Sequence, residues 1–278
     1  MMAMRRVRKG SERMSLRFAL AVGALTLATI GAAAEDAGPA RFTGESGACH
    51  YGADVARFQS PLPRVSARLV SGLPVTIVAI GSSSTAGAGA SSPAASYPSR
   101  LAADLTKRLH YDRITVVNRG VNGEEAADML KRFDSEVLSE KPDLVLWQVG
   151  VNGLLRETEM DATVTQINEG IQRLKAAGAD VVLIDPQYAP KVLAKASLND
   201  LLARFEIIAQ ANKVQLFHRF ALMRAWHDAN GMSFDKFVSP DGLHMNDWSY
   251  ACLATALGVA IAEAGTRPTA TAAAHPPR

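Results

Sequence analysis

The chain has 278 residues, of which 48% are hydrophobic and 21% charged, a composition that excludes a disordered, collagen-like or multi-span membrane protein. The formal net charge of +3 arises in the first 34 residues, which hold six of the 30 Lys and Arg residues and one of the 27 acidic residues. The rest of the chain carries 24 basic and 26 acidic residues, so the charge balance gives no support for nucleic-acid binding.

The first 34 residues have the organisation of a signal peptide. A positively charged head precedes an uncharged stretch at residues 18–30, and alanines at residues 32–34 supply the small side chains of a cleavage site. The uncharged stretch is short for a membrane span of about 20 residues, which favours a cleaved leader over a permanent anchor. The sequence therefore predicts an exported protein, periplasmic or extracellular, with no stable membrane insertion after cleavage.

The next segment, residues 35–72, has no clear hydrophobic period. It is interpreted as an amino-terminal arm that wraps the following domain or belongs partly to a linker. From residue 73 onward, short β-branched segments alternate with longer segments of helical periodicity, the pattern of a parallel sheet covered by helices on both faces. Five strands are predicted, at residues 75–80, 114–118, 144–149, 181–185 and 214–217.

A last helix is predicted at about residues 249–264, so that residues 73–266 form one α/β domain. Residues 267–278, rich in Ala, Thr and Pro, are predicted to be a loose tail. The two cysteines after the leader, Cys49 and Cys252, could pair in an oxidising compartment, and a disulfide and two free thiols both fit the sequence. No CxxC or His-rich spacing occurs, so neither a metal nor a cofactor is expected.

Polar, turn-forming segments follow the predicted strands. Ligands of a parallel sheet bind beyond the carboxyl ends of its strands, so these segments are expected to meet at one edge. Together they bring a hydroxyl group, backbone donors, a carboxamide and an Asp/His pair to that edge. The segments are residues 81–87, 118–123 and 150–153 after the first three strands, and residues 239–244 beyond the fifth.

These residue types suit nucleophilic catalysis by a serine. A serine hydroxyl needs a base during attack, usually an imidazole oriented by a carboxylate, and Asp241 and His244 are three residues apart on one loop. The attack creates an oxyanion, which fixed donors stabilise. The backbone amide of Gly120 and the side chain of Asn152 are suitable donors.

The four segments, in this order across about 165 residues, resemble the sequence blocks of the SGNH hydrolases, also called GDSL esterases or lipases. The resemblance implies a flavodoxin-like three-layer α/β/α sandwich with a five-stranded parallel sheet, and ester or thioester hydrolysis without a metal. It assigns the nucleophile to Ser83 and the Asp-x-x-His pair to Asp241 and His244. It also implies an oxyanion hole made of Ser83, Gly120 and Asn152.

Two positions depart from the family pattern. Ser82 stands where the family usually has Asp, and Gly153 follows Asn152 where the third block commonly has Asp. Neither departure removes a triad or oxyanion residue. Both bear on the rigidity of the loops, because a hydroxyl or a glycine cannot make the hydrogen bonds of a carboxylate.

Several other polar residues near the predicted edge have plainer interpretations. Asp235 is a rival for the triad carboxylate, but Asp241 has the closer spacing to His244. Arg119 is interpreted as a solvated charge or an ion-pair partner, and Gln187 as a polar turn residue. Trp248 is expected to anchor the last helix to the core.

The sequence thus predicts an exported serine esterase that hydrolyses carboxylic esters through an acyl-enzyme. Short acyl groups are favoured because no long apolar insertion follows the first three strands, and O-acetyl groups on glycans are the candidate substrate. Three alternatives remain open: an acyl-thioesterase or lysophospholipase, an acyltransferase with the same triad, and a glycan-binding module without catalytic activity. The expected partner is a small-molecule or glycan ester.

Overall fold

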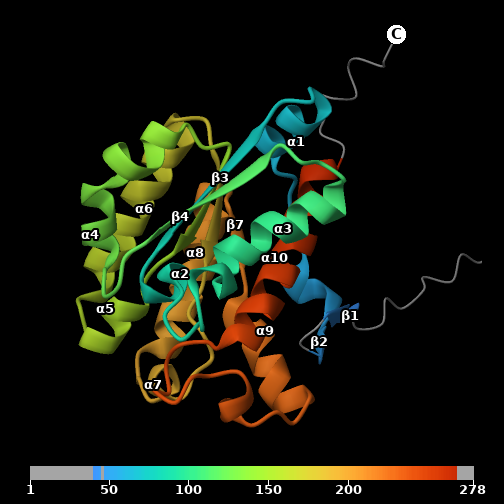
Figure 1. Ribbon diagram of the computed structural model, residues 1–278. Helices are drawn as coiled ribbons and strands as arrows, with labels where there is room; N and C mark the ends of the chain where they lie inside the picture. Colours follow the sequence, from blue (N-terminus) through green and yellow to red (C-terminus); the bar gives the residue numbers. More distant parts are fainter. Residues whose placement is uncertain (1–39, 45–46, 268–278) are drawn as a thin grey trace, which may run out of the picture. The chain divides into compact units, whose positions relative to one another are not determined.

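The computed structural model describes residues 40–44 and 47–267 (Figure 1). The predicted signal peptide and residues 268–278 of the predicted tail lie outside the described residues.

A five-stranded parallel sheet forms the centre of the protein. Its strands lie in the order β4-β3-β5-β6-β7, which is the flavodoxin-like order, and every neighbouring pair is parallel. The prediction of five parallel strands is confirmed, and each strand overlaps its predicted range. The strands are β3 (Val75–Gly81), β4 (Ile114–Gly120), β5 (Leu144–Gln148), β6 (Asp180–Ile184) and β7 (Gln215–Phe217).

The burial of the strand side chains explains why the strands are apolar segments in the sequence. Every side chain of β5 is buried, and β3 and β6 are buried almost throughout. Helices cover both faces of a parallel sheet, so its inner strands carry continuous Val, Ile and Leu rather than alternating residues. The edge strand β4 is only partly buried.

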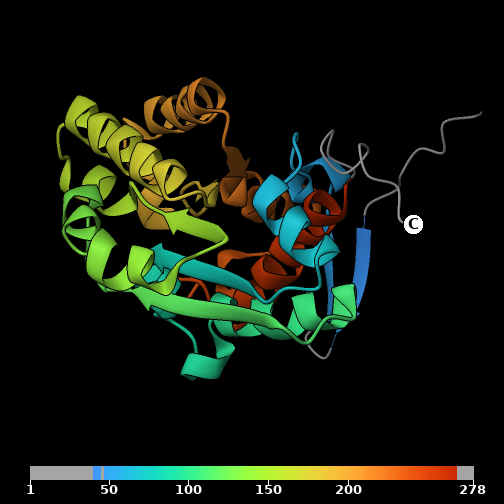
Figure 2. The same cartoon turned by 90° about the horizontal axis from the view of Figure 1, so that it is seen from above.

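Helices cover the two faces of the sheet and make the predicted three-layer sandwich (Figures 1 and 2). One layer consists of α4, α6 and α8, and the other of α1, α3 and α10. Helix α6 illustrates the pattern, because its buried residues recur at spacings of three and four. The bounds are α1 (Pro63–Val70), α3 (Tyr97–Leu109), α4 (Ala126–Lys131), α6 (Met160–Ala176), α8 (Leu198–Asn212) and α10 (Asp247–Thr266).

Shorter helices follow the carboxyl ends of the strands: α2 (Ser83–Ala86), α5 (Val151–Arg156), α7 (Pro190–Leu193) and α9 (Arg219–Arg224). Single turns of other helix types are η1 (Ala53–Ala56), η2 (Pro93–Ala95), η3 (Phe133–Val137), η4 (Leu138–Glu140), η5 (Ala225–Ala229) and η6 (Phe234–Lys236).

The segment before residue 73 contains regular structure that its lack of hydrophobic period concealed. Strands β1 (Ala40–Gly44) and β2 (Gly47–Tyr51) form an antiparallel hairpin, and α1 packs against α10. The Asp180 carboxylate accepts the backbone amides of Arg64 and Val65 at 3.0 Å each, which holds the start of α1 beside β6. A disulfide joins Cys49 to Cys252 with a Cα–Cα distance of 5.7 Å, and it ties β2 to α10.

Within the described part of the chain, α10 is the one helix long and apolar enough to cross a membrane. Its most apolar stretch is 67% buried inside the protein, so α10 is a core helix of this fold. It begins with a capping box in which the Asn246 side chain accepts the Ser249 amide at 3.1 Å. This cap fixes the helix start three residues after His244.

Candidate active site

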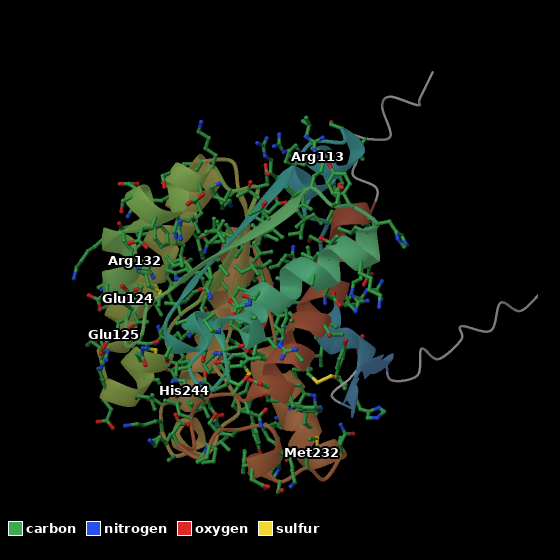
Figure 3. All side chains as sticks on the ribbon, viewed as in Figure 1. Arg113, Glu124, Glu125, Arg132, Met232 and His244 are labelled. Carbon is green, nitrogen blue, oxygen red and sulfur yellow. A yellow bond between two sulfur atoms is a disulfide. The ribbon has the colours of Figure 1, made fainter. Side chains whose placement is uncertain are left out.

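The structure brings Ser83, His244 and Asp241 together beyond the carboxyl edge of the sheet, and Figure 3 labels His244 in the lower part of the molecule. The Oγ atom of Ser83 lies 2.7 Å from Nε2 of His244, although the two residues are 161 positions apart in sequence. The other ring nitrogen of His244, Nδ1, hydrogen bonds to Oδ2 of Asp241. A hydroxyl, an imidazole and a carboxylate are thus connected in one line, the arrangement that activates a serine.

Ser83 is directed into the site by the residue before it. The amide and the hydroxyl of Ser82 both donate to Oε1 of Gln148, at 3.0 and 3.1 Å. Gln148 is buried at the end of β5, so Ser82 points into the core and α2 begins at Ser83. The Ser83 amide belongs to the first turn of α2 and has no partner within the helix. The hydroxyl of Ser82, which departs from the family pattern, therefore secures the turn through Gln148.

The loop of residues 239–244 is closed by its own hydrogen bonds. A bridge joins Val238 to Met245, and the Ser239 amide donates to the His244 carbonyl at 2.7 Å. Inside the loop, Oδ1 of Asp241 accepts the amides of Leu243 at 2.9 Å and His244 at 3.0 Å. One carboxylate therefore orders both the backbone and the imidazole.

These contacts also set the charge of Asp241. Partial burial acts to raise its pKa, but the hydrogen bonds from the His244 ring and from the amides of His244 and Leu243 outweigh burial and lower the pKa below its usual value. Asp241 is ionised at neutral pH, so it holds a proton on Nδ1 of His244. Nε2 is then the acceptor that faces Ser83.

Buried polar groups support this loop from the core. Gln187 donates through Nε2 to the Leu243 carbonyl at 3.3 Å and accepts Nη2 of Arg219 at 2.9 Å. Arg219 is fully buried, and burial lowers its pKa to about 10. Its Nε donates to the carbonyl of Asp185 at 2.9 Å. Gln187 is thus a structural link beneath the His244 loop.

Gly120, the predicted oxyanion donor, uses its backbone amide for a different hydrogen bond. Its amide donates to Oδ1 of Asn118 at 2.9 Å and is therefore already engaged. A Cβ atom at Gly120 would lie 2.1 Å from the Ala86 nitrogen, so this glycine permits the close packing of α2 on β4. Asn118 completes the contact by donating to the Thr85 carbonyl at 2.8 Å. The role of Gly120 is to seat α2, and the oxyanion assignment for its amide is corrected.

A second glycine of the same segment, Gly123, has the free amide. No residue in the described ranges accepts a hydrogen bond from it. The next residue, Glu124, accepts Nδ2 of Asn152 through its backbone carbonyl at 2.8 Å, which fixes the carboxamide of Asn152 and leaves its second N–H available. The family resemblance assigned this donor to Gly120, and the sequence signal for the alternative is a second glycine three residues later in the same segment, Gly123.

The second departure from the family pattern has a local explanation. Oε2 of Glu125 lies 3.7 Å from the position that a Cβ atom of Gly153 would occupy. Glu125 is held there by Arg156 at 2.7 Å and by the Thr158 hydroxyl at 2.8 Å. An acidic side chain at position 153 would lie beside this carboxylate, and two like charges at such a distance repel each other.

The remaining candidates lie outside the Ser83–His244–Asp241 line. Asp235 contacts Ser233 and Lys236 rather than His244. Arg119 pairs with Glu140, and Trp248 packs edge-on against Trp226 with ring centroids 4.9 Å apart, as expected for structural residues. In the residues described, no group of three or more His, Cys, Asp or Glu side chains is arranged to hold a metal ion.

The sequence matches the non-GDSL lipase-like family over residues 48–267. The chain belongs to this family. This match and the flavodoxin-like strand order together confirm the resemblance to the SGNH hydrolases.

Known proteins similar to this chain include esterases. An arylesterase of Vibrio mimicus is 30% identical over 95 residues, which are 34% of this chain and 46% of the arylesterase. A two-domain esterase active on acetylated mannans, co-crystallised with mannopentaose, superposes with a TM-score of 0.64 and 19% identity, over 77% of this chain and 58% of that one. An acetyl xylan esterase, AlAXEase, gives a TM-score of 0.56 and 20% identity, over 66% and 98% of the two chains. The two structures share the fold, and the chain spans about half of the arylesterase.

Proposed function

We propose that this protein is a carboxylic ester hydrolase in which Ser83 is the nucleophile, His244 the general base and Asp241 the residue that orients the imidazole. The observation that carries the proposal is the 2.7 Å contact between Ser83 Oγ and His244 Nε2, with Asp241 on the opposite ring nitrogen. Membership of the lipase-like family supports it.

The reaction proceeds in two steps. Ser83 Oγ attacks the ester carbonyl carbon as Nε2 of His244 takes the hydroxyl proton, and the same proton then passes to the leaving alcohol as the acyl-enzyme forms. Water, activated by His244, attacks the acyl-enzyme and releases the acid together with free Ser83. Asp241 stays ionised and stabilises the imidazolium of each step.

The negative charge that develops on the carbonyl oxygen is stabilised by the amides of Ser83 and Gly123 and by the second N–H of Asn152. These donors come from the ends of three neighbouring strands, β3, β4 and β5. Fixed donors of this kind lower the barrier because they need no reorganisation during the reaction.

Short acyl groups, in particular O-acetyl groups on glycans, are the proposed substrate. The fold neighbours include esterases active on acetylated mannans and xylan. The only regular element in the segment between α2 and α3 is the short turn η2. Two hydrogen bonds hold this segment against α10: the Ser91 amide donates to Asp247, and the Tyr250 hydroxyl donates to the Ala88 carbonyl. We place the protein outside the cytoplasm, a proposal that the Cys49–Cys252 disulfide supports because disulfides persist in oxidising compartments.

The catalytic assignment is tested by covalent labelling with a fluorophosphonate probe. Wild type and Ser84→Ala should label, whereas Ser83→Ala should not, and turnover of p-nitrophenyl acetate should fall by about 10⁴-fold or more in Ser83→Ala. Folded wild type that neither labels nor turns over esters would identify a non-catalytic binding module instead.

The substrate class is tested by p-nitrophenyl esters with acyl chains of increasing length, compared with acetylated mannan and xylan. The highest kcat/KM is expected for acetyl esters. A maximum at long chains or at acyl thioesters would point to a lipase or thioesterase. Transfer of the acetyl group to added alcohols or sugars in preference to water would identify an acyltransferase.

A further inference from the structure

Glu124 connects the two proposed oxyanion donors that lie outside α2. Its amide follows Gly123 directly, and its carbonyl accepts Nδ2 of Asn152 at 2.8 Å. A shift of the Glu124 backbone would therefore move the Gly123 amide and release the Asn152 carboxamide in one event. The Glu124 carboxylate binds Arg132, the residue that follows α4, and Figure 3 labels both residues on the same side of the molecule.

Arg132 clamps the Glu124 carboxylate with three hydrogen bonds. Its Nε lies 3.0 and 2.9 Å from the two carboxylate oxygens, and its Nη2 lies 2.7 Å from Oε2. The exposed fractions of the two side chains are only 11% for Arg132 and 15% for Glu124. A forked guanidinium on a carboxylate fixes orientation as well as distance, and water screens a pair this covered only weakly.

The guanidinium also reaches the strand that leads into this loop. Nη2 of Arg132 donates to the Arg119 carbonyl at 2.8 Å, and Nη1 lies 3.0 Å from Glu136. Arg132 thus grips both sides of the turn at residues 120–124, namely the end of β4 and the residue after Gly123. No contact joins Arg132 to Ser83, His244 or Asp241 in the described chain.

We propose that Glu124 and Arg132 are positioning residues. They hold the Gly123 amide and the Asn152 carboxamide where both can donate hydrogen bonds to the oxyanion. This inference rests on the proposed function. An oxyanion hole works by preorganisation, and a misplacement of about 1 Å can reduce the rate by about 10²-fold. The pair leaves substrate binding and proton transfer to other residues, so its loss should lower kcat specifically.

The test compares Glu124→Gln, which keeps the shape of the side chain, with Arg132→Met and Arg132→Lys. For each variant, kcat per titrated active site, KM and the pH profile are measured on p-nitrophenyl acetate, with the melting temperature as a record of folding. Asp104→Asn is the matched control, because it breaks a similarly covered ion pair with Arg108 within α3.

We expect kcat to fall 10- to 100-fold in Glu124→Gln and Arg132→Met, with KM within threefold and the inflections of the pH profile unmoved. Arg132→Lys keeps the charge without the fork and should fall between these variants and wild type. The double variant should be no worse than the poorer single variant, because one contact is lost in each. Asp104→Asn should keep wild-type kcat even where its melting temperature drops.

Normal kcat in Glu124→Gln beside an active wild type overturns the positioning role and leaves the proposed function intact. A rise of KM that matches the loss of kcat/KM, or a displaced pH profile, also overturns it. Wild type whose turnover does not depend on Ser83 overturns the proposed function and the positioning role together. If Arg132→Met does not fold, Glu124→Gln and Arg132→Lys decide the question.

Discussion

The two loops that complete the candidate site are held in different ways. The loop of residues 239–244 is closed by its own backbone and by Asp241, whose two oxygens bind groups within three residues of it. The loop of residues 121–124 is held from outside, by Arg132 on its side chain and by Asn152 on its backbone. Most of the hydrogen bonds that shape the first loop join residues 238–245, and Gln187 and Lys191 each add one bond from outside, to the carbonyls of Leu243 and Gly242. The second loop is held mainly by residues outside it, Arg132 and Asn152.

This difference predicts where each loop is vulnerable. Changes far from the His244 loop should alter stability without altering the Ser83–His244 contact. Changes in the supports of the 121–124 loop should reach the reaction rate even when the fold is intact.

The largest effect is expected within the self-contained loop itself. Asp241→Asn keeps an oxygen that can accept the amides of Leu243 and His244, but the neutral carboxamide no longer fixes the Nδ1 proton. We expect kcat for p-nitrophenyl acetate to fall by about 10⁴-fold, with the melting temperature within a few degrees of wild type. A loss below tenfold would mean that Asp241 does not orient the imidazole.

The next effect separates stability from geometry. Replacing Cys49 and Cys252 together with Ala removes a link between residues 203 positions apart, which should cost about 3–5 kcal/mol of unfolding free energy. Urea unfolding measures this loss. Because the His244 loop does not depend on that link, kcat at 25 °C should stay within twofold of wild type, and a parallel loss of kcat would show that the loop is not self-contained.

In the externally held loop, Asn152→Ala should lower kcat by about 10²- to 10³-fold with little change in KM, since one oxyanion donor and the bond to Glu124 are lost. Asn122→Ala is the matched control, because Asn122 is an exposed residue of the same turn. Its kcat should remain within twofold of wild type. Equal losses in the two variants would argue against a specific role for Asn152.

The same difference explains what the sequence could and could not predict. The sheet was predictable because its buried strands are continuous apolar runs, and the Asp241–His244 pair because its geometry is local. The pairing of Cys49 with Cys252 and the packing of α1 on α10 join segments about 200 residues apart, and no local period marks them.

The oxyanion glycine shows the limit most clearly. Gly120 and Gly123 are equivalent by residue type, and sequence reasoning chose the first. The Asn118 side chain accepts a hydrogen bond from the Gly120 amide, and Ala86 of α2 packs closely against Gly120. The direction of a backbone amide is therefore set by tertiary contacts, which a motif does not specify.

A smaller effect tests the core side of the His244 loop. Gln187→Met removes the bond to the Leu243 carbonyl and leaves Nη2 of the buried Arg219 without its acceptor. Arg219 already has one unpaired buried nitrogen, Nη1, so the variant should lose about 2 kcal/mol of unfolding free energy in urea. Since the loop closes itself, kcat should stay within fivefold, and a loss above tenfold would show that Gln187 shapes the site.

The smallest effect concerns acid stability and follows from the hydrogen bonds of Asp241. Partial burial acts to raise the pKa of this carboxyl, but the bonds from His244 and Leu243 lower it below the value of about 3.9 expected in the unfolded chain. The unfolded chain then binds the proton more tightly, so the stabilisation is complete above about pH 5 and is lost as the pH falls through the folded pKa.

Melting temperatures of wild type and Asp241→Asn between pH 2 and 7 measure this contribution. The difference between them should be constant from pH 5 to 7 and should shrink on further acidification. It should be small, because the Asp241 side chain is 43% exposed and solvent screens its interactions. A difference that grows below pH 4 would mean that burial affects the pKa of Asp241 more strongly than the hydrogen bonds do. The backbone hydrogen bonds of the loop would then contribute more to its order than Asp241 does.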